Sequence, residues 1–275
     1  MINCRSFLLV CCCLILLLSP AANARQAELS RAEEIVLKLG GTPPAFAYIS
    51  TLLTRALELR EYVVHVRNRG DIPTTRLEVM LERGEISAFI LGPTPRRDQL
   101  FLPVHVGMTD GLVNRRILFI PQGSQAVYDQ VKTLDDFKRL GKVAGLGGAW
   151  SDRDIWAAND LPVIAIGGDW KRLYQMVAAR NRGMDYLPRG AHEIALEWPA
   201  HPQLQVERNL VLVYDQDHIL YVSPADPDLH ALLQEVLVEA RDSGLIAELA
   251  ADFFAAAFEP PVNMNQRRVI PLPLP

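Results

Sequence analysis

Segments typical of strands and of helices alternate along the chain, and this order constrains the fold more than any other feature. A first run predicts strands at residues 34–39, 62–66 and 86–91, with helices beginning at Pro43 and covering 74–83. A second run predicts strands at 142–145, 162–166 and 184–187, with helices over 151–159, 169–180 and 191–198. Each β-α-β-α-β order is typical of a mostly parallel sheet covered by helices. Two α/β units of ~100 residues each account for the pattern.

The first residues form a segment of a different kind. All four cysteines lie in or beside the apolar run over residues 7–18, which follows Arg5. Ala22-Asn23-Ala24 supplies the small residues that signal peptidase requires, and the run is too short to cross a bilayer. The pattern predicts a cleaved signal peptide over residues 1–24 and a periplasmic protein without thiols. A lipoprotein is disfavoured because Val10, before Cys11, is not small.

Composition and motifs exclude several classes of function. The chain has 28 Lys+Arg against 32 Asp+Glu, a net charge of −4, and no basic run that would favour nucleic acid or an anionic membrane. No later segment approaches 18 apolar residues, so we expect a chain that is not membrane-embedded. The six histidines are scattered, and the motifs of nucleotide-binding loops and of serine or zinc hydrolases are absent from the sequence. We therefore expect no cofactor, no metal and no catalytic residues.

Several short motifs occur in the order found in a known family. They are RLEVMLERGEI at 76–86, RDQLFLP at 97–103, LDDF at 134–137, GGAWSD at 147–152, NRGMDYLPRG at 181–190 and RRVI at 267–270. The ordered set resembles a poorly characterised branch of family 3 of the periplasmic solute-binding proteins, the type II binding proteins. The chain departs from the family at Asn114-Arg115, where Gly-Tyr is usual, and at Met184 and Leu187, which replace aromatic residues.

The resemblance implies a two-lobed α/β fold in which each lobe is a mixed sheet flanked by helices and two crossover strands join the lobes. Lobe one would comprise residues 32–121 plus 219–258, lobe two residues 122–218, and residues 259–275 would form an extended tail. A small ligand would be held in the cleft while the lobes close on it. A monomer that delivers its ligand to an inner-membrane permease is the implied arrangement.

Eight side chains are candidates for ligand contact. They are Arg97, Trp150, Asp152, Asp185, Arg189, Tyr186, Tyr48 and Arg116. Arg97 follows a strand end, and its planar guanidinium suits a carboxylate; the alternative is a solvent-facing charge like Arg96. Arg116 matches the crossover arginine of the family, or braces the hinge.

Each of the other candidates also has two interpretations, one in ligand binding and one in the structure. Trp150 either stacks on the ligand or covers the core, and Asp152 either accepts from an ammonium or stabilises its helix start. Ser151 is expected to cap that helix with Asp154 as its capping-box partner. Asp185, Tyr186 and Arg189 follow a strand and either meet the ligand or form structural pairs, for instance between Arg189 and Asp185 or Glu193. Tyr48 either stacks on the ligand or lies in the helix core.

Three functions remain open from the sequence. The first is capture of an amino-acid-like or carboxylate-bearing ligand for ABC-type uptake. The second is a ligand-sensing input for a membrane sensor protein. The third, suggested by dehydratases that share the fold, is an enzyme in which Asp152, Asp185 or Glu193 shuttles a proton.

Overall fold

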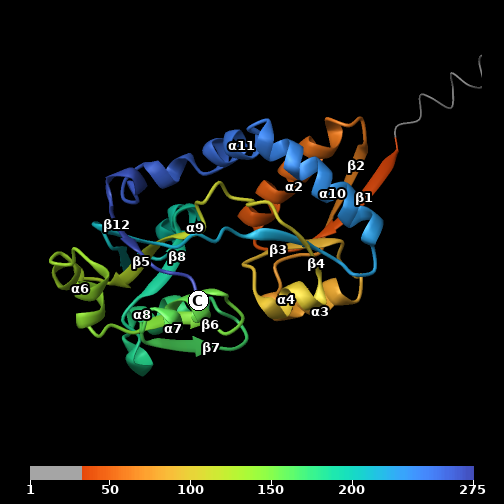
Figure 1. Ribbon diagram of the computed structural model, residues 1–275. Helices are drawn as coiled ribbons and strands as arrows, with labels where there is room; N and C mark the ends of the chain where they lie inside the picture. Colours follow the sequence, from red (N-terminus) through yellow and green to blue (C-terminus); the bar gives the residue numbers. More distant parts are fainter. Residues whose placement is uncertain (1–32) are drawn as a thin grey trace, which may run out of the picture. The chain divides into compact units, whose positions relative to one another are not determined.

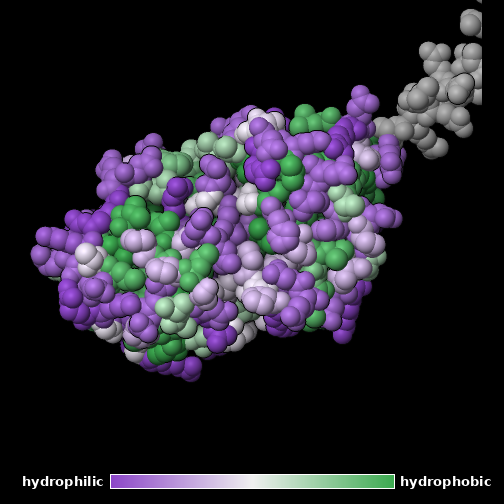
Figure 2. All heavy atoms as spheres, viewed as in Figure 1, coloured by the Kyte–Doolittle hydropathy of each residue, from purple (hydrophilic) through white to green (hydrophobic). Residues whose placement is uncertain are grey.

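The structure is a computed structural model that describes residues 33–275 (Figure 1). Residues 34–275 form one unit by their mutual contacts. The expected signal peptide over residues 1–24, and residue 32 at the expected start of lobe one, lie outside the described residues. Among residues 33–275 no helix combines the length and apolar character needed to cross a membrane. Figure 2 shows hydrophilic and hydrophobic residues interspersed over the visible face of this unit.

The first group of strands lies around one long amphipathic helix. Strands β1 (Glu34–Leu39) and β2 (Val63–Asn68) pair in parallel, joined by helix α2 (Pro43–Glu58). Pro at the first helical positions starts α2, because its missing N–H costs no hydrogen bond there. Its buried residues recur at helical spacing and include Leu52, Leu53 and Leu57, and helices α10 (Pro227–Asp242) and α11 (Leu245–Phe253) pack against it. Strand β11 (Ile219–Val222) pairs antiparallel with β3 (Ala88–Leu91) and β4 (Leu102–Val104).

The second group of strands is built around β5 (Arg115–Pro121). This strand is antiparallel to β8 (Leu187–Gly190), β9 (Leu204–Val206) and β10 (Leu210–Val213). A separate parallel pair consists of β6 (Ala144–Gly147) and β7 (Val163–Ile166). The remaining helices are α3 (Thr74–Glu82), α4 (Pro95–Leu100), α5 (Gln125–Tyr128), α6 (Leu134–Arg139), α7 (Asp152–Ala158), α8 (Arg172–Ala178) and α9 (Ala191–Glu197).

The structure confirms the predicted alternation and differs from it in three places. Parallel and antiparallel pairs occur together, and the sheet around β5 contains both, whereas the alternation alone favoured a mostly parallel sheet. The strand expected at 184–187 is shifted, because residues up to Tyr186 run beside β6 and only the next four residues pair with β5. The capping box at Ser151 is wrong: its backbone is helical and its side chain caps nothing, whereas a cap requires an extended residue.

The segment over residues 259–275 is more than an extended surface tail. It contains β12 (Arg268–Pro271), which pairs in parallel with β10 and completes the sheet around β5. Ile270 is fully buried and Leu272 nearly so, in the cluster that also holds Trp156 and Tyr186. The Arg267 side chain is buried as well and donates to the carbonyls of Glu207 and Leu210. The expectation missed this strand because its four residues carry no periodicity and their pairing partner is distant in sequence.

Candidate functional site

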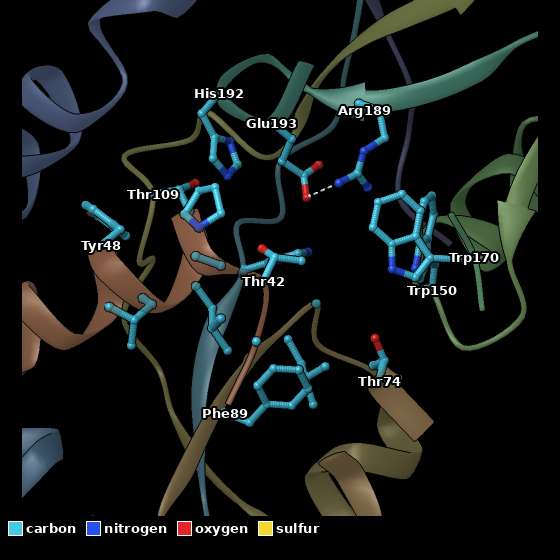
Figure 3. Close-up of a pocket in the computed structure, with 18 of the residues that line it drawn as sticks. Thr42, Tyr48, Thr74, Phe89, Thr109, Trp150, Trp170, Arg189, His192 and Glu193 are labelled. Atoms are coloured by element: carbon cyan, nitrogen blue, oxygen red, sulfur yellow. Dashed lines mark hydrogen bonds and ion pairs between the residues drawn. The ribbon is translucent and has the colours of Figure 1, made fainter. Parts of the chain in front are cut away.

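A cavity of about 190 Å³ opens where several strands end (Figure 3). It is lined by the residues that follow β1, β3, β6 and β8, which is the edge where open α/β sheets bind ligands. The cavity is smaller than the roughly 300–1,000 Å³ of pockets for drug-sized molecules. Figure 3 shows Tyr48 on one side, Trp150 and Trp170 on the other, Glu193 and Arg189 above, and Phe89 below. The site therefore suits a small molecule held between a charged end and an apolar end.

Arg116 and Asp152 form the most deeply buried ion pair of the cavity. Both side chains are 3% exposed, and Nε of Arg116 lies 2.8 Å from Oδ1 of Asp152. The Tyr214 hydroxyl donates to Asp152 Oδ1 at 3.0 Å and accepts from Arg116 Nε at 2.8 Å. Burial opposes the charge of the guanidinium, but the Asp152 carboxylate keeps the pKa of Arg116 above its usual value. Arg116, on β5, thereby fixes the start of α7.

Arg189 lies between two carboxylates and two indole rings. Its Nη2 donates to Glu193 Oε1 at 2.9 Å and to Glu197 Oε1 at 2.7 Å, and its Nε donates to Glu197 Oε2. The guanidinium carbon lies 4.4 Å from the Trp170 ring centroid and 5.1 Å from that of Trp150, both within cation–π range. Burial works against its charge, but Glu193 and Glu197 hold the pKa of Arg189 well above its ordinary value. Within the described residues, Nη1 is the one nitrogen of this guanidinium without a protein acceptor.

Glu193 is the carboxylate common to both arginines. Its Oε2 accepts from the Gly190 N–H at 2.8 Å and lies 3.2 Å from Arg116 Nη1, while its Oε1 accepts from Arg189. Burial favours the neutral acid, yet Arg189 and then Arg116 lower the pKa of Glu193 to about 2. The group is therefore an anion at neutral pH and has no proton to donate.

Arg97 is 4% exposed, and protein groups occupy most of its N–H donors. Nε and Nη2 donate to Glu78 Oε1 at 3.0 and 2.7 Å. Nη1 donates to the Gly92 carbonyl and Nη2 to the Ala149 carbonyl, each at 2.6 Å. Glu78 Oε1 thus already accepts from the two nitrogens that were expected to hold a ligand carboxylate, and a single N–H on Nη1 remains.

Two histidines line the cavity near these charges. Burial and, next, the Arg116 guanidinium lower the pKa of His218 to about 3. Burial also lowers the pKa of His192, whose Nδ1 is buried without a hydrogen-bond partner among residues 33–275. Both rings are consequently neutral at pH 7. No cluster of three or more His, Cys, Asp or Glu side chains in the described part of the chain is arranged to hold a metal ion.

The structure brings six of the eight predicted side chains to the cavity. They are Tyr48, Arg97, Arg116, Trp150, Asp152 and Arg189. Tyr48 also belongs to the core, since its hydroxyl donates to the Met108 carbonyl at 2.8 Å.

Asp185 and Tyr186 lie outside the cavity lining. Asp185 pairs with Lys142 at 3.0 Å, and Tyr186 is fully buried and accepts from the Trp156 indole N–H at 2.9 Å. They miss the cavity because their strand runs on to Gly190, and the chain reaches the site only there.

Sequence reasoning missed three residues that matter to the site. Trp170 follows Gly167-Gly168 after a strand, as Trp150 follows Gly147-Gly148, and this repeated pattern was a usable signal. Phe89 lies on a predicted strand with no feature that separates it from core residues. Glu78 lies on a predicted helix, and only the folded structure brings it to Arg97.

Comparisons with known proteins agree on the fold. No family model and no curated protein sequence matches the chain. Among solved structures, an ancestral arginine-binding protein bound to glutamine is 14% identical, with a TM-score of 0.57 over 80% of this chain and 97% of that one. The GluR0 ligand-binding core with L-glutamate is 14% identical, with a TM-score of 0.57 over 80% and 98%. The substrate-binding protein AbpA from Streptococcus pneumoniae, bound to L-arginine, is 12% identical, with a TM-score of 0.53 over 86% and 99%. The chain therefore has the two-lobed α/β fold of the periplasmic binding proteins.

Proposed function

We propose that this protein is a periplasmic solute-binding protein that captures one small polar molecule of about amino-acid size. The observation that carries the proposal is the cavity at the strand ends, lined by charged groups on one side and apolar ones on the other. The structural neighbours support it, since their names state binding of glutamine, glutamate or arginine. Delivery to an inner-membrane permease is the role we propose for the loaded protein.

We further propose that the binding unit has two lobes, residues 32–121 with 219–258 and residues 122–218. The cavity draws Tyr48 and Phe89 from the first range and Trp150 and Arg189 from the second. A ligand that touches both would draw the lobes together and remove its own polar groups from water. Capture followed by closure would present one defined surface to a membrane partner.

The site favours binding over chemistry. Asp152 is held by Arg116 and Tyr214, and Glu193 is ionised between two arginines. A proton shuttle at neutral pH needs a group whose pKa lies near 7. The proposed role is accordingly reversible capture, without turnover of the ligand.

Ligand-induced stabilisation tests the proposal. Protein carrying residues 25–275 is melted with amino acids, dicarboxylates and polyamines at millimolar concentration. A ligand that binds only the folded state raises the stability by about 2.7 kcal/mol at a concentration one hundred times its Kd. The Trp150→Ala variant should lose the shift and Trp198→Ala, at an exposed site, should keep it. Absence of any shift across the three classes would contradict capture.

A further inference from the structure

The charged side chains that line the cavity do not favour the binding of an anionic ligand. Three arginines and four carboxylates line it: Arg97, Arg116, Arg189, Asp71, Asp152, Glu193 and Glu197. Asp71, however, pairs with Lys171, which lies outside the lining. Arg97 pairs with Glu78, so Arg116 and Arg189 are left facing the three carboxylates of Asp152, Glu193 and Glu197. Since both histidines are neutral, these two arginines and three carboxylates carry one surplus negative charge. A buried charge is tolerated only when it is paired, so a ligand that brings another negative charge would add an unpaired anion.

Each of these three arginines also has at least one carboxylate partner in the protein. Arg97 bonds Glu78, a residue behind the lining, so this guanidinium is neutralised before any ligand enters. Arg116 is paired with Asp152 and Glu193. Nη1 of Arg189 donates to no other group among the described residues, but the guanidinium already pairs with Glu193 and Glu197. A ligand carboxylate there would be the third carboxylate around one cation.

The cavity is better equipped to receive a cation. Glu193 Oε1 accepts one hydrogen bond, from Arg189, and a carboxylate oxygen has room for two. Trp150 and Trp170 also line the cavity, and their rings already attract the Arg189 guanidinium, so this aromatic wall suits ammonium and guanidinium groups. Figure 3 shows Phe89 on the side of the cavity away from Glu193, and Ile49 and Leu91 are among the other apolar residues of the lining.

We propose that the ligand is a small amine or guanidine with an apolar body and no carboxylate, and that Glu78 excludes carboxylates by occupying Arg97. The inference rests on the proposed capture function and names the chemistry of the captured molecule. The amine donates to Glu193, and the apolar body lies against Phe89. Glu78 acts as a built-in carboxylate on α3, so it sets specificity without touching the ligand.

Calorimetric titration of matched pairs tests the proposal, because the two members of a pair differ only by a carboxylate. Suitable pairs are agmatine with arginine, putrescine with ornithine, and phenethylamine with phenylalanine. The wild-type protein should bind the amine of at least one pair about tenfold or more tighter than the amino acid. Glu78→Gln keeps the shape and leaves the Arg97 charge unmatched, so it should shift that preference toward the amino acid by about tenfold or more. Glu82→Gln is the matched control, since Glu82 is exposed one turn further along α3.

The outcomes separate the inference from the proposed function. Tighter binding of the amino acids by the wild-type protein overturns the inference and leaves capture standing. An unchanged preference in Glu78→Gln overturns the role given to Glu78. Failure of every compound to bind either protein overturns capture, and the ligand class with it. If Glu78→Gln does not fold, the affinities of the wild-type protein for the three pairs of compounds decide the ligand class.

Discussion

At the scale of single residues, the cavity holds its charges as buried pairs. Arg116 and Asp152 are each 3% exposed, so their free energy of desolvation is large and is offset only while both are present. Exposed pairs on the same protein, such as Lys138 with Asp160, have water as an alternative partner. The two kinds of pair should therefore respond differently to the loss of one member.

Replacement of Asp152 by Ala should lower the free energy of unfolding by about 3 kcal/mol, the low end for a broken buried pair, because Arg116 keeps only Glu193 as a counter-charge. Urea unfolding measures the change. The control Asp160→Ala removes an exposed partner and should cost less than about 1 kcal/mol. Equal losses in the two variants would show that the Arg116–Asp152 pair is solvated in solution.

Protonation of His218 should make the stability depend on pH. Its folded pKa of about 3 lies below the ~6.5 of an unfolded chain, so the unfolded state binds the extra proton between these values. Stability should be complete above pH 6.5 and decline toward pH 3, by at most about 1.4 kcal/mol per pH unit from this group. The charged groups around it are Arg116, Glu193 and Arg97, with His192 as a second imidazole.

Urea unfolding over this pH range, in the wild-type protein and in His218→Gln, measures the dependence. The variant should show a shallower slope between pH 3 and 6.5. His105→Gln, at an exposed position, should keep the wild-type slope. Superimposable curves for the wild type and His218→Gln would show that the imidazole does not change its protonation on folding.

At the scale of elements, β12 adds the end of the described chain to the edge of the sheet around β5, beside β10. Ile270 is the one buried residue of this strand, whereas its neighbour Val269 is 57% exposed. Ile270→Ala should therefore cost about 2–5 kcal/mol of unfolding free energy, and Val269→Ala, on the same strand, much less. Chemical denaturation checks both. A similar cost for the two variants would mean that β12 is not seated on β10.

The sequence determined the elements whose signal is local and left out those made by distant pairing. Helix α2 was predictable because its buried leucines recur at helical spacing after two prolines. Strands β8 and β12 were not, because β5 and β10, far away in sequence, decide where they begin. The site follows the same division: Arg97 and Trp150 stand out beside strand ends, whereas the pairing of Arg97 with Glu78 depends on how α3 packs.

At the scale of the whole binding unit, two loops meet closely at the cavity. A Cβ at Gly92 would overlap the Ser151 hydroxyl, so glycine is needed where the end of β3 approaches the start of α7. The Arg97 side chain donates a hydrogen bond to the Ala149 carbonyl between the same two loops. The approach joins the two ranges proposed as lobes, so we expect it to form when the proposed lobes close.

Gly92→Ala should therefore weaken ligand binding, by about tenfold or more, while each sheet stays folded. Calorimetry with the best ligand of the panel measures the affinity, and X-ray scattering should report a more open average form. Gly167→Ala is the control, because a Cβ there meets no atom within 4 Å. Wild-type affinity in Gly92→Ala would show that this approach is not needed for binding.

The late position of β12 also bears on how the molecule can be made. Synthesis proceeds from the N-terminus, and the partner strand β10 is complete long before residues 268–271 emerge from the ribosome. Until then β10 keeps a bare edge, and Ile270 cannot fill its place in the core. The sheet around β5 therefore gains its β12 edge strand only after residues 268–271 have been synthesised.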